Sequence, residues 1–232
     1  MVKKEKTMSN SQNNITVDDF KKSLEEHRII AHRVRNKEAD TFRFLRTKIL
    51  QAMSKEGYKT LAVSSPNYND GKTTIATNLA VSISQDLKQR VLLVDLDLRT
   101  PSIDKFLGLK SKHGLTDYLE GKAEVQDCLV RTPFKRFSVF PAGHSIDESS
   151  ETLGSPQMEK LAKELAERYS DRLVIYDMPP LLEQDDPLVF LPHVDAALLV
   201  VKEGVTTTDE IKRCIDILSS SKVLGTVLNS VL

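Results

Sequence analysis

Four consecutive residues, Gly71, Lys72, Thr73 and Thr74, are the part of the chain best suited to bind phosphate. A lysine ammonium, a hydroxyl beside it and unpaired N–H groups at a helix start together hold phosphates and Mg²⁺. The apolar run 61–63 predicts a strand before the loop, and the spacing of apolar residues in 75–83 predicts a helix after it. Gly-Lys-Thr alone is a common tripeptide, but this context favours a nucleotide site.

The loop departs from the full G-x-x-x-x-G-K-[ST] pattern. Pro66 occupies the first glycine position, and Asn69 stands where many such loops carry another glycine. Because asparagine tolerates positive φ better than most residues, the loop geometry stays accessible. We therefore expect Asn69 and Asp70, with the four residues after them, to contact the nucleotide.

Carboxylates follow two predicted strands. Asp95 and Asp97 come after the apolar run 91–94, and Asp177 comes after the run 173–176. In an open α/β sheet, ligands bind at the carboxyl ends of the strands, where buried carboxylates need a cation or a hydrogen-bonding partner. The alternative for Asp95 is a capping role alone.

These residues together predict a Mg²⁺·nucleotide site. Lys72 would bridge β- and γ-phosphates, while Thr73, Asp97 and Asp177 would hold the metal. Asp95 would remain free to orient or deprotonate the attacking group.

Strands alternate with helices along the chain, which predicts an α/β fold with a mostly parallel sheet and helices on both faces. We expect a disordered or helical N-terminal extension over 1–36 and one domain over 37–232. Thr16 with Asp19 resembles a capping box that opens a helix through about Ile30. Further helices are predicted over about 38–54, from the Gly-Lys-Thr loop to near Lys88, and over 114–121, 155–169 and 207–220; further strands over 136–143, 194–204 and 222–232.

Composition excludes several classes of protein. The 232 residues carry 33 basic and 33 acidic side chains, so no overall field points to nucleic acid. Cys128 and Cys214 have neither disulfide-framework nor zinc spacing, which suits a reducing cytosol. No apolar run approaches the ~20 residues of a membrane span, and no signal-peptide core is present. Any work at a membrane would need a partner.

Asp40, Arg43 and Arg46 lie one turn apart on a predicted helix and form a charged ridge. The ridge could reach a neighbouring subunit, or it could be an ordinary surface ladder; spacing alone does not separate the two. Similarly, the basic segment 21–48 is either a solvated helical face or a docking surface for an acidic or membrane partner.

Three motifs together resemble the cytoplasmic domain of bacterial tyrosine kinases of the capsule and exopolysaccharide type, within the partition-type P-loop ATPases. The most specific is VLLVDLDLRTP, an apolar run followed by D-x-D-x-R. LVIYDMPP matches the family's apolar run plus D-x-P-P, and the resemblance extends from about Asp40 to Asn229.

The resemblance implies a role for several residues. Lys72 and Thr73 are the P-loop contacts, Asp95 and Asp97 the catalytic and metal carboxylates, and Asp177 the third acidic ligand. Asn229, after the last strand, would contact the base. The family's E-x-x-R-x-x-R assembly helix reads Asp40-x-x-Arg43-x-x-Arg46 here, with aspartate replacing glutamate.

The implied function is an ATP- and Mg²⁺-dependent protein-tyrosine kinase, or a kinase-derived ATPase, in exopolysaccharide polymerisation and export. It would form homo-oligomers and dock from the cytoplasm, at the inner face of the plasma membrane, on a membrane chain-length-determinant (polysaccharide co-polymerase) protein. The alternative is a nucleotide-gated switch without tyrosine phosphorylation. Residues 64–70 lack the lysine of the partition branch, so we expect no binding to nucleic acid. No tyrosine follows Tyr176, which leaves the phosphoacceptor open.

Overall fold

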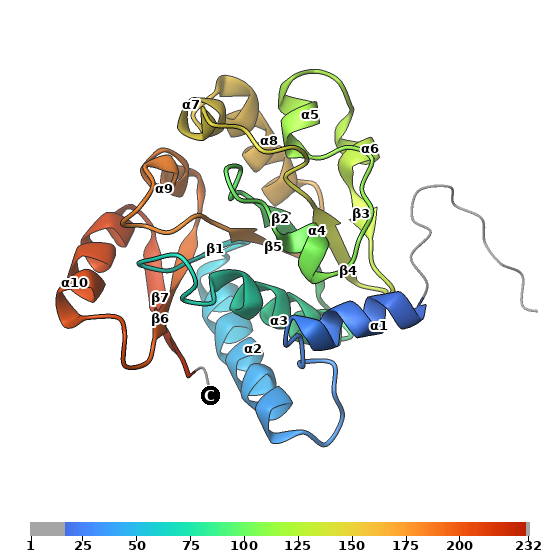
Figure 1. Ribbon diagram of the computed structural model, residues 1–232, viewed down its shortest axis with the longest axis vertical. Coiled ribbons are helices and arrows are strands. Elements are labelled where there is room, and N and C mark those ends of the chain that lie inside the picture. Colours follow the sequence, from blue (N-terminus) through green and yellow to red (C-terminus); the bar gives the residue numbers. More distant parts are fainter. Residues whose placement is uncertain (1–16, 231–232) are drawn as a thin grey trace, which may run out of the picture.

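Seven strands form one sheet in the computed structural model, which describes residues 17–230. Their order is β3-β4-β2-β5-β1-β6-β7, and Figure 1 shows β6 and β7 at the left and β3 and β4 at the right. All neighbours are parallel except β3 and β4, which pair antiparallel at one edge. The predicted mostly parallel α/β fold is confirmed. The strands are β1 (Thr60–Ser64), β2 (Arg90–Asp95), β3 (Val130–Arg131), β4 (Phe137–Phe140), β5 (Arg172–Asp177), β6 (Ala196–Lys202) and β7 (Lys222–Asn229).

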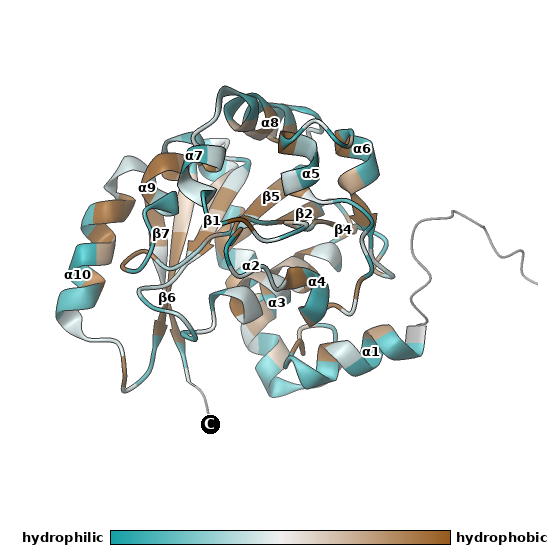
Figure 2. Cartoon of the chain, turned by 45° about the horizontal axis from the view of Figure 1, so that its top comes forward, coloured by the Kyte–Doolittle hydropathy of each residue, from teal (hydrophilic) through white to brown (hydrophobic). Residues whose placement is uncertain are grey.

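Helices cover both faces of the sheet, because alternate strand residues point to opposite sides. Leu61 and Val63 of β1 pack into one core and Ala62 into the other. Figure 2 shows apolar residues concentrated along the strands and hydrophilic residues along outer helices such as α1. The first core lies beneath α1 (Val17–Glu26), α2 (Lys37–Glu56), α3 (Lys72–Ser84) and α4 (Ile103–Phe106); the second beneath α5 (Leu115–Leu119), α6 (Val125–Cys128), α7 (Ser149–Leu153), α8 (Pro156–Glu167), α9 (Asp186–Phe190) and α10 (Thr208–Ile217).

The N-terminal segment is held against α3. Asn78 accepts hydrogen bonds from the backbone of Ile30 and Ala31 and donates one to Arg28. Phe20 and Leu24 of α1 are 2% and 1% exposed and belong to the first core. The described part of the extension thus packs on the domain, while the division at residue 36 stays a prediction.

Two predicted helices end earlier than expected. The helix expected to reach Ile30 ends at Glu26, because Arg28 adopts a left-handed φ of 56° and Ile29 N–H bonds Leu24 O at 2.7 Å. The helix expected to reach Lys88 ends at Ser84, where Asp86 turns the chain by accepting from Lys88 N–H at 2.8 Å. The segment 1–14 and Thr16, the first residue of the expected capping box, lie outside the described residues.

Other differences concern short elements. The helix expected over 207–220 is α10 followed by a 3₁₀ turn, Leu218–Ser220. The sequence reading missed β3, α4, α6, α7 and α9, each five residues or shorter, because so few residues carry no clear period. Cys128 and Cys214 are buried free thiols. Within residues 17–230, no helix is both long and apolar enough to cross a bilayer.

Candidate phosphate-binding site

The loop between β1 and α3 has the geometry of a phosphate cradle. Asn69 and Gly71 adopt left-handed φ values of 63° and 97°. Asn69 thus has the positive φ that asparagine was expected to tolerate at this position. Asp70 closes the turn by accepting from Asn67 N–H at 2.9 Å. The cradle ends at Lys72, the first residue of α3, where helix N–H groups lack partners within the helix.

Side chains from distant segments fix the loop from outside. Asn67 donates from Nδ2 to Glu210 of α10 at 2.8 Å, and Tyr68 donates from its backbone N–H to Glu183 at 3.0 Å. The Tyr68 hydroxyl also contacts the Gln184 amide. Sequence reasoning missed these supports, because 115 or more residues separate the partners.

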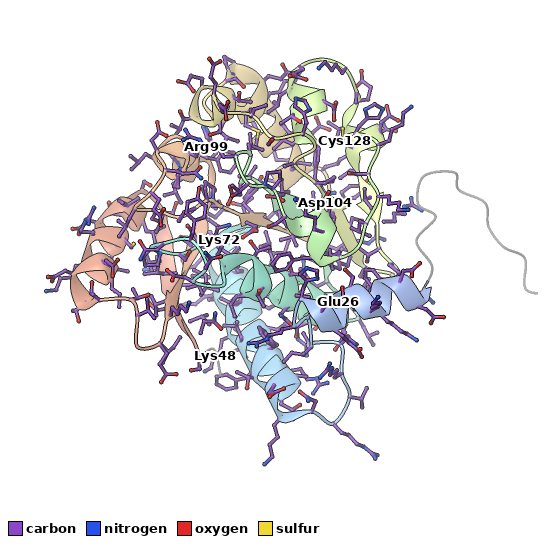
Figure 3. All side chains as sticks on the ribbon, viewed as in Figure 1. Glu26, Lys48, Lys72, Arg99, Asp104 and Cys128 are labelled. Carbon is purple, nitrogen blue, oxygen red and sulfur yellow. The ribbon has the colours of Figure 1, made fainter. Side chains whose placement is uncertain are left out.

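Lys72 meets the predicted carboxylates in the interior. Its Nζ lies 2.8 Å from Asp97 Oδ2, and Lys72 is only 8% exposed. Thr73 donates from Oγ1 to Asp177 Oδ2 at 2.6 Å. Asp95 and Asp177 are register partners at the carboxyl ends of β2 and β5. Figure 3 shows Lys72 near the middle of the molecule, at the start of α3.

Burial shapes the charges of this cluster. It raises the pKa of Asp177, although Lys72 and the Thr73 hydrogen bond pull in the other direction. Burial alone would lower the pKa of Lys72, but the charges of Asp177 and Asp97 outweigh it and the pKa is raised. Lys72 is therefore a fixed cation, surrounded by more buried carboxyl groups than it can neutralise.

Asp95 is not free, contrary to expectation. Its Oδ2 accepts from Ser102 N–H and Ile103 N–H at 3.0 and 3.1 Å, and its Oδ1 from Asp97 N–H at 3.1 Å. Burial, followed by the charge of Asp177, raises its pKa. Asp95 thus fastens the loop after β2 to the start of α4, which is close to the capping alternative.

The donor set fits a divalent cation with a nucleotide phosphate. Asp177 Oδ1 is buried and has no hydrogen-bond partner among the described residues, so one carboxylate oxygen is left for another ligand. Carboxylate and hydroxyl oxygens are the ligands that Mg²⁺ prefers. The carboxylates of Asp97 and Asp177, with the Thr73 hydroxyl, could hold such an ion.

Asn229, at the end of β7, lies against the loop. Its Nδ2 donates to Asp70 O at 2.8 Å, and a Cβ on Gly71 would overlap its amide. A cavity of about 1150 Å³ opens here. Its lining includes most of the predicted site residues, Asn69, Gly71, Lys72, Thr73, Thr74, Asp97 and Asn229, but not Asp70, Asp95 or Asp177.

Sequence reasoning also missed two groups of side chains. Arg28 and Arg33, from the segment after α1, line the same cavity, and the basic run 21–48 was the signal that pointed there. Arg99 of the D-x-D-x-R motif donates from Nε to Ser149 Oγ at 2.8 Å and lies 3.6 Å from Asp185. Arg99 is thus held by α7 and the segment before α9.

The predicted assembly ridge makes contacts within its own chain. Arg43 pairs with Asp40 and also contacts Arg33 O, while Arg46 donates to Ser82 O at 2.8 Å. Asp40 and Arg43 remain on the surface of α2, whereas Arg46 also ties α2 to α3. A role of these residues in oligomers stays a prediction.

Comparisons with known proteins agree with this geometry. The family model described as an AAA domain matches residues 50–212. The chain is 33% identical over 194 residues to the tyrosine-protein kinase Wzc of Salmonella typhi, covering 83% of this chain but only 27% of that protein. With the tyrosine-protein kinase YwqD of Bacillus subtilis it shares 31% identity, covering 82% of this chain and 80% of that one.

Two further similarities bear on fold and context. The kinase domain of the Escherichia coli tyrosine kinase Etk superposes with a TM-score of 0.77 at 29% identity, covering 86% of this chain and 82% of that one. The succinoglycan biosynthesis transport protein ExoP of Rhizobium meliloti is 29% identical, over 92% of this chain and 27% of that protein. The chain thus spans about a quarter of the length of Wzc and ExoP.

Proposed function

The chain belongs to the bacterial tyrosine-protein kinase family of P-loop proteins, and from this premise we propose that it transfers the γ-phosphoryl group of ATP to protein tyrosine. One observation carries the proposal: Lys72 and Thr73, at the end of a phosphate cradle, are hydrogen-bonded to the carboxylates of Asp97 and Asp177. Phosphoryl transfer depends mostly on positioning and charge stabilisation, and this cluster supplies both.

Each side chain has a proposed task. The backbone from Asn69 to Thr74 and the ammonium of Lys72 bind the phosphates. Thr73, Asp97 and Asp177 hold Mg²⁺, which when bound neutralises charge on the phosphates. Asn229 contacts the base from the end of β7.

Asp97 is the best placed of the three carboxylates to meet the attacking hydroxyl. It lines the cavity, whereas Asp95 is not among the lining residues. Asp95 therefore acts as a positioning residue that sets the place of Asp97 through the backbone N–H of that residue. The role of proton acceptor expected at Asp95 stays a prediction.

A second function rests on the Lys72–Asp97 ion pair. A phosphate that binds Lys72 competes with Asp97 for the ammonium, so nucleotide binding would release the loop after β2. The protein would then be a nucleotide-gated switch whose ATP state controls assembly.

One experiment separates these functions. Purified protein is incubated with Mg²⁺ and γ-labelled ATP, with Asp177→Asn as the metal-site variant and Asp171→Asn, exposed before β5, as the control. Phosphotyrosine in the wild type and the control, but not in Asp177→Asn, supports the kinase. ATP hydrolysis without phosphotyrosine reduces the proposal to an ATPase, and nucleotide binding without either product favours the switch.

Partners follow from the same premise. The name of one relative, the succinoglycan biosynthesis transport protein ExoP, connects the family to polysaccharide biosynthesis, so we propose a role in exopolysaccharide polymerisation and export. It would act at the inner face of the plasma membrane through a membrane chain-length-determinant protein and would form homo-oligomers through Asp40, Arg43 and Arg46. Co-purification with the membrane partner tests the docking; a chain that stays with the soluble fraction in the partner's presence contradicts it.

A further inference from the structure

A second cavity opens at the other end of the sheet. It measures about 1040 Å³ and lies at the amino ends of β2 and β5, whose carboxyl ends bear Asp95 and Asp177. Five residue steps at ~3.3 Å each place the two ends about 17 Å apart along a strand. The loop between β3 and β4, at the right of the sheet in Figure 1, forms another wall.

The cavity is lined by positive charge. No aspartate or glutamate is among its described lining residues, although the whole chain is neutral. Two of the cations have acidic partners outside the lining: Arg90 with Asp171 at 3.1 Å and Arg168 with Glu164 at 3.2 Å. Within residues 17–230, the other four make no ion pair. The six cations are Arg90, Arg131, Lys135, Arg136, Arg168 and Arg172.

Two of these arginines begin adjacent strands, and a third directly precedes the next strand, β4. Arg90 and Arg172 are direct register partners, and Val91 N–H bonds Arg136 O at 2.9 Å on the other side of β2. Like charges on paired strands repel, which costs stability when no anion lies between them. The arrangement is therefore unfavourable for the empty fold and suits an anionic ligand.

Arg172 points to a ligand most directly. It is only 8% exposed, and its Nε is buried without a hydrogen-bond partner among the described residues. Its Nη2 donates to Leu165 O at 2.9 Å, and its guanidinium lies 4.5 Å from the ring centre of Tyr169. Burial lowers its pKa. A buried guanidinium with an unused donor and no carboxylate partner is costly unless an anion completes it.

We propose that this cavity is a second anion site that binds a ligand with more than one phosphate group. Arginine presents planar, paired N–H donors that match phosphate oxygens, and several arginines around one space favour a ligand of several negative charges. The volume lies at the upper end of the range for small-molecule pockets. The phosphates belong either to a soluble diphosphate or to the headgroups of a lipid surface.

The test uses inorganic pyrophosphate, titrated calorimetrically into the full chain without divalent metal. The site variant is Arg131→Gln with Arg136→Gln, both outside the buried core, so the fold is retained. Lys163→Gln, an exposed lysine of α8 outside the cavity lining, is the matched control. Lys72→Ala removes the phosphate contact of the other site and so separates the two.

We expect pyrophosphate to bind the wild type, the control and Lys72→Ala, and to bind the double variant at least tenfold more weakly at the second site. Binding should weaken with added salt, because the partners are charges near solvent. No binding in Lys72→Ala that circular dichroism shows to be folded, or equal binding in the double variant and the wild type, overturns the proposal for a soluble ligand.

The second arm tests a lipid source with vesicles of phosphatidylcholine, with and without cardiolipin, a lipid with two phosphates. Co-sedimentation that needs cardiolipin, is lost in the double variant and is displaced by pyrophosphate identifies headgroups as the ligand. Pyrophosphate binding without vesicle binding identifies a soluble diphosphate. If neither probe distinguishes the double variant from Lys163→Gln, the site does not exist.

Discussion

Lys72 Nζ donates to Asp97 Oδ2 at 2.8 Å, so the ammonium at the start of α3 is already engaged by a buried carboxylate. Asp97 also accepts from Thr100 Oγ1 at 2.8 Å through its other oxygen. The pair therefore connects the start of α3 to the loop after β2. The Asp97 carboxylate supplies the negative charge beside Lys72 that a bound phosphate would otherwise supply. Stability and ligand binding depend on the same contact.

Lys72→Ala should destabilise the nucleotide-free protein as well as abolish ATP binding. It leaves Asp97 and its carboxylate neighbours without a cation in the interior, and breaking a buried ion pair in this way costs about 3–5 kcal/mol. Urea unfolding at neutral pH measures the loss, and Lys163→Ala, an exposed lysine on α8, is the control. Equal unfolding free energies for the two variants would show that the ion pair contributes nothing to the fold.

The central chemistry was predictable because it is encoded locally. Lys72 and Thr73 follow a strand and open a helix, and Asp97 and Asp177 end apolar strands, so the rule that parallel strands align their carboxyl ends brings them together. The same reasoning predicted the parallel sheet, since only the order of strands and helices is needed.

What the sequence did not predict depends on the paths of loops. Asp95 is hydrogen-bonded because the chain after β2 returns to place Ser102 N–H against it, and Arg99 turns to Ser149. No local pattern specifies those contacts. The end of α1 at Glu26 likewise depends on Asn78, which holds the following segment from α3.

Gly71→Ala should cost more than an ordinary glycine substitution in a left-handed turn. Gly71 has a φ of 97°, and its new Cβ would overlap the Asn229 amide. Gly57→Ala is a matched control, because its φ of 73° imposes similar strain while its Cβ would meet no atom within 4 Å. The strain alone is worth about 1–3 kcal/mol. In thermal unfolding, the melting temperature of Gly71→Ala should be lower than that of Gly57→Ala.

The clash with Asn229 can be tested separately. Combining Gly71→Ala with Asn229→Ala removes the overlap but keeps the backbone strain, so the double variant should recover toward the stability of Gly57→Ala. Strict additivity of the two single changes would mean that the two side chains do not meet.

The ridge on α2 contains two kinds of residue that mutation should separate. Arg46→Ala removes a hydrogen bond to Ser82 O and should lower the unfolding free energy by about 1 kcal/mol, besides any effect on assembly. Asp40→Ala removes only an exposed pair with Arg43 and should change stability by under about 0.5 kcal/mol. If the ridge mediates assembly, light scattering will show smaller oligomers for Asp40→Ala at unchanged stability. Unchanged oligomer size would assign the ridge to the monomer.

Glu210 makes the loop's support dependent on pH. Its carboxylate accepts from Thr207 N–H and Asn67 Nδ2, each at 2.8 Å, and these bonds, with that from the Thr207 hydroxyl, lower its pKa from the ordinary 4.5 to about 2. A depressed pKa means that the folded state prefers the ion. The resulting stability is therefore complete above about pH 5 and is lost as the pH falls toward 2.

Glu210→Gln should accordingly have a lower melting temperature than the wild type at pH 7. The difference between the two melting temperatures should narrow steadily between pH 5 and 3. Glu167→Gln, exposed at the end of α8 and outside the loop, is the matched control. Circular dichroism melts across this range measure both gaps. Because Glu210 also anchors Asn67 of the phosphate cradle, the same substitution should weaken ATP binding at pH 7. A gap that stays constant with pH would mean that the charge of Glu210 does not support the loop.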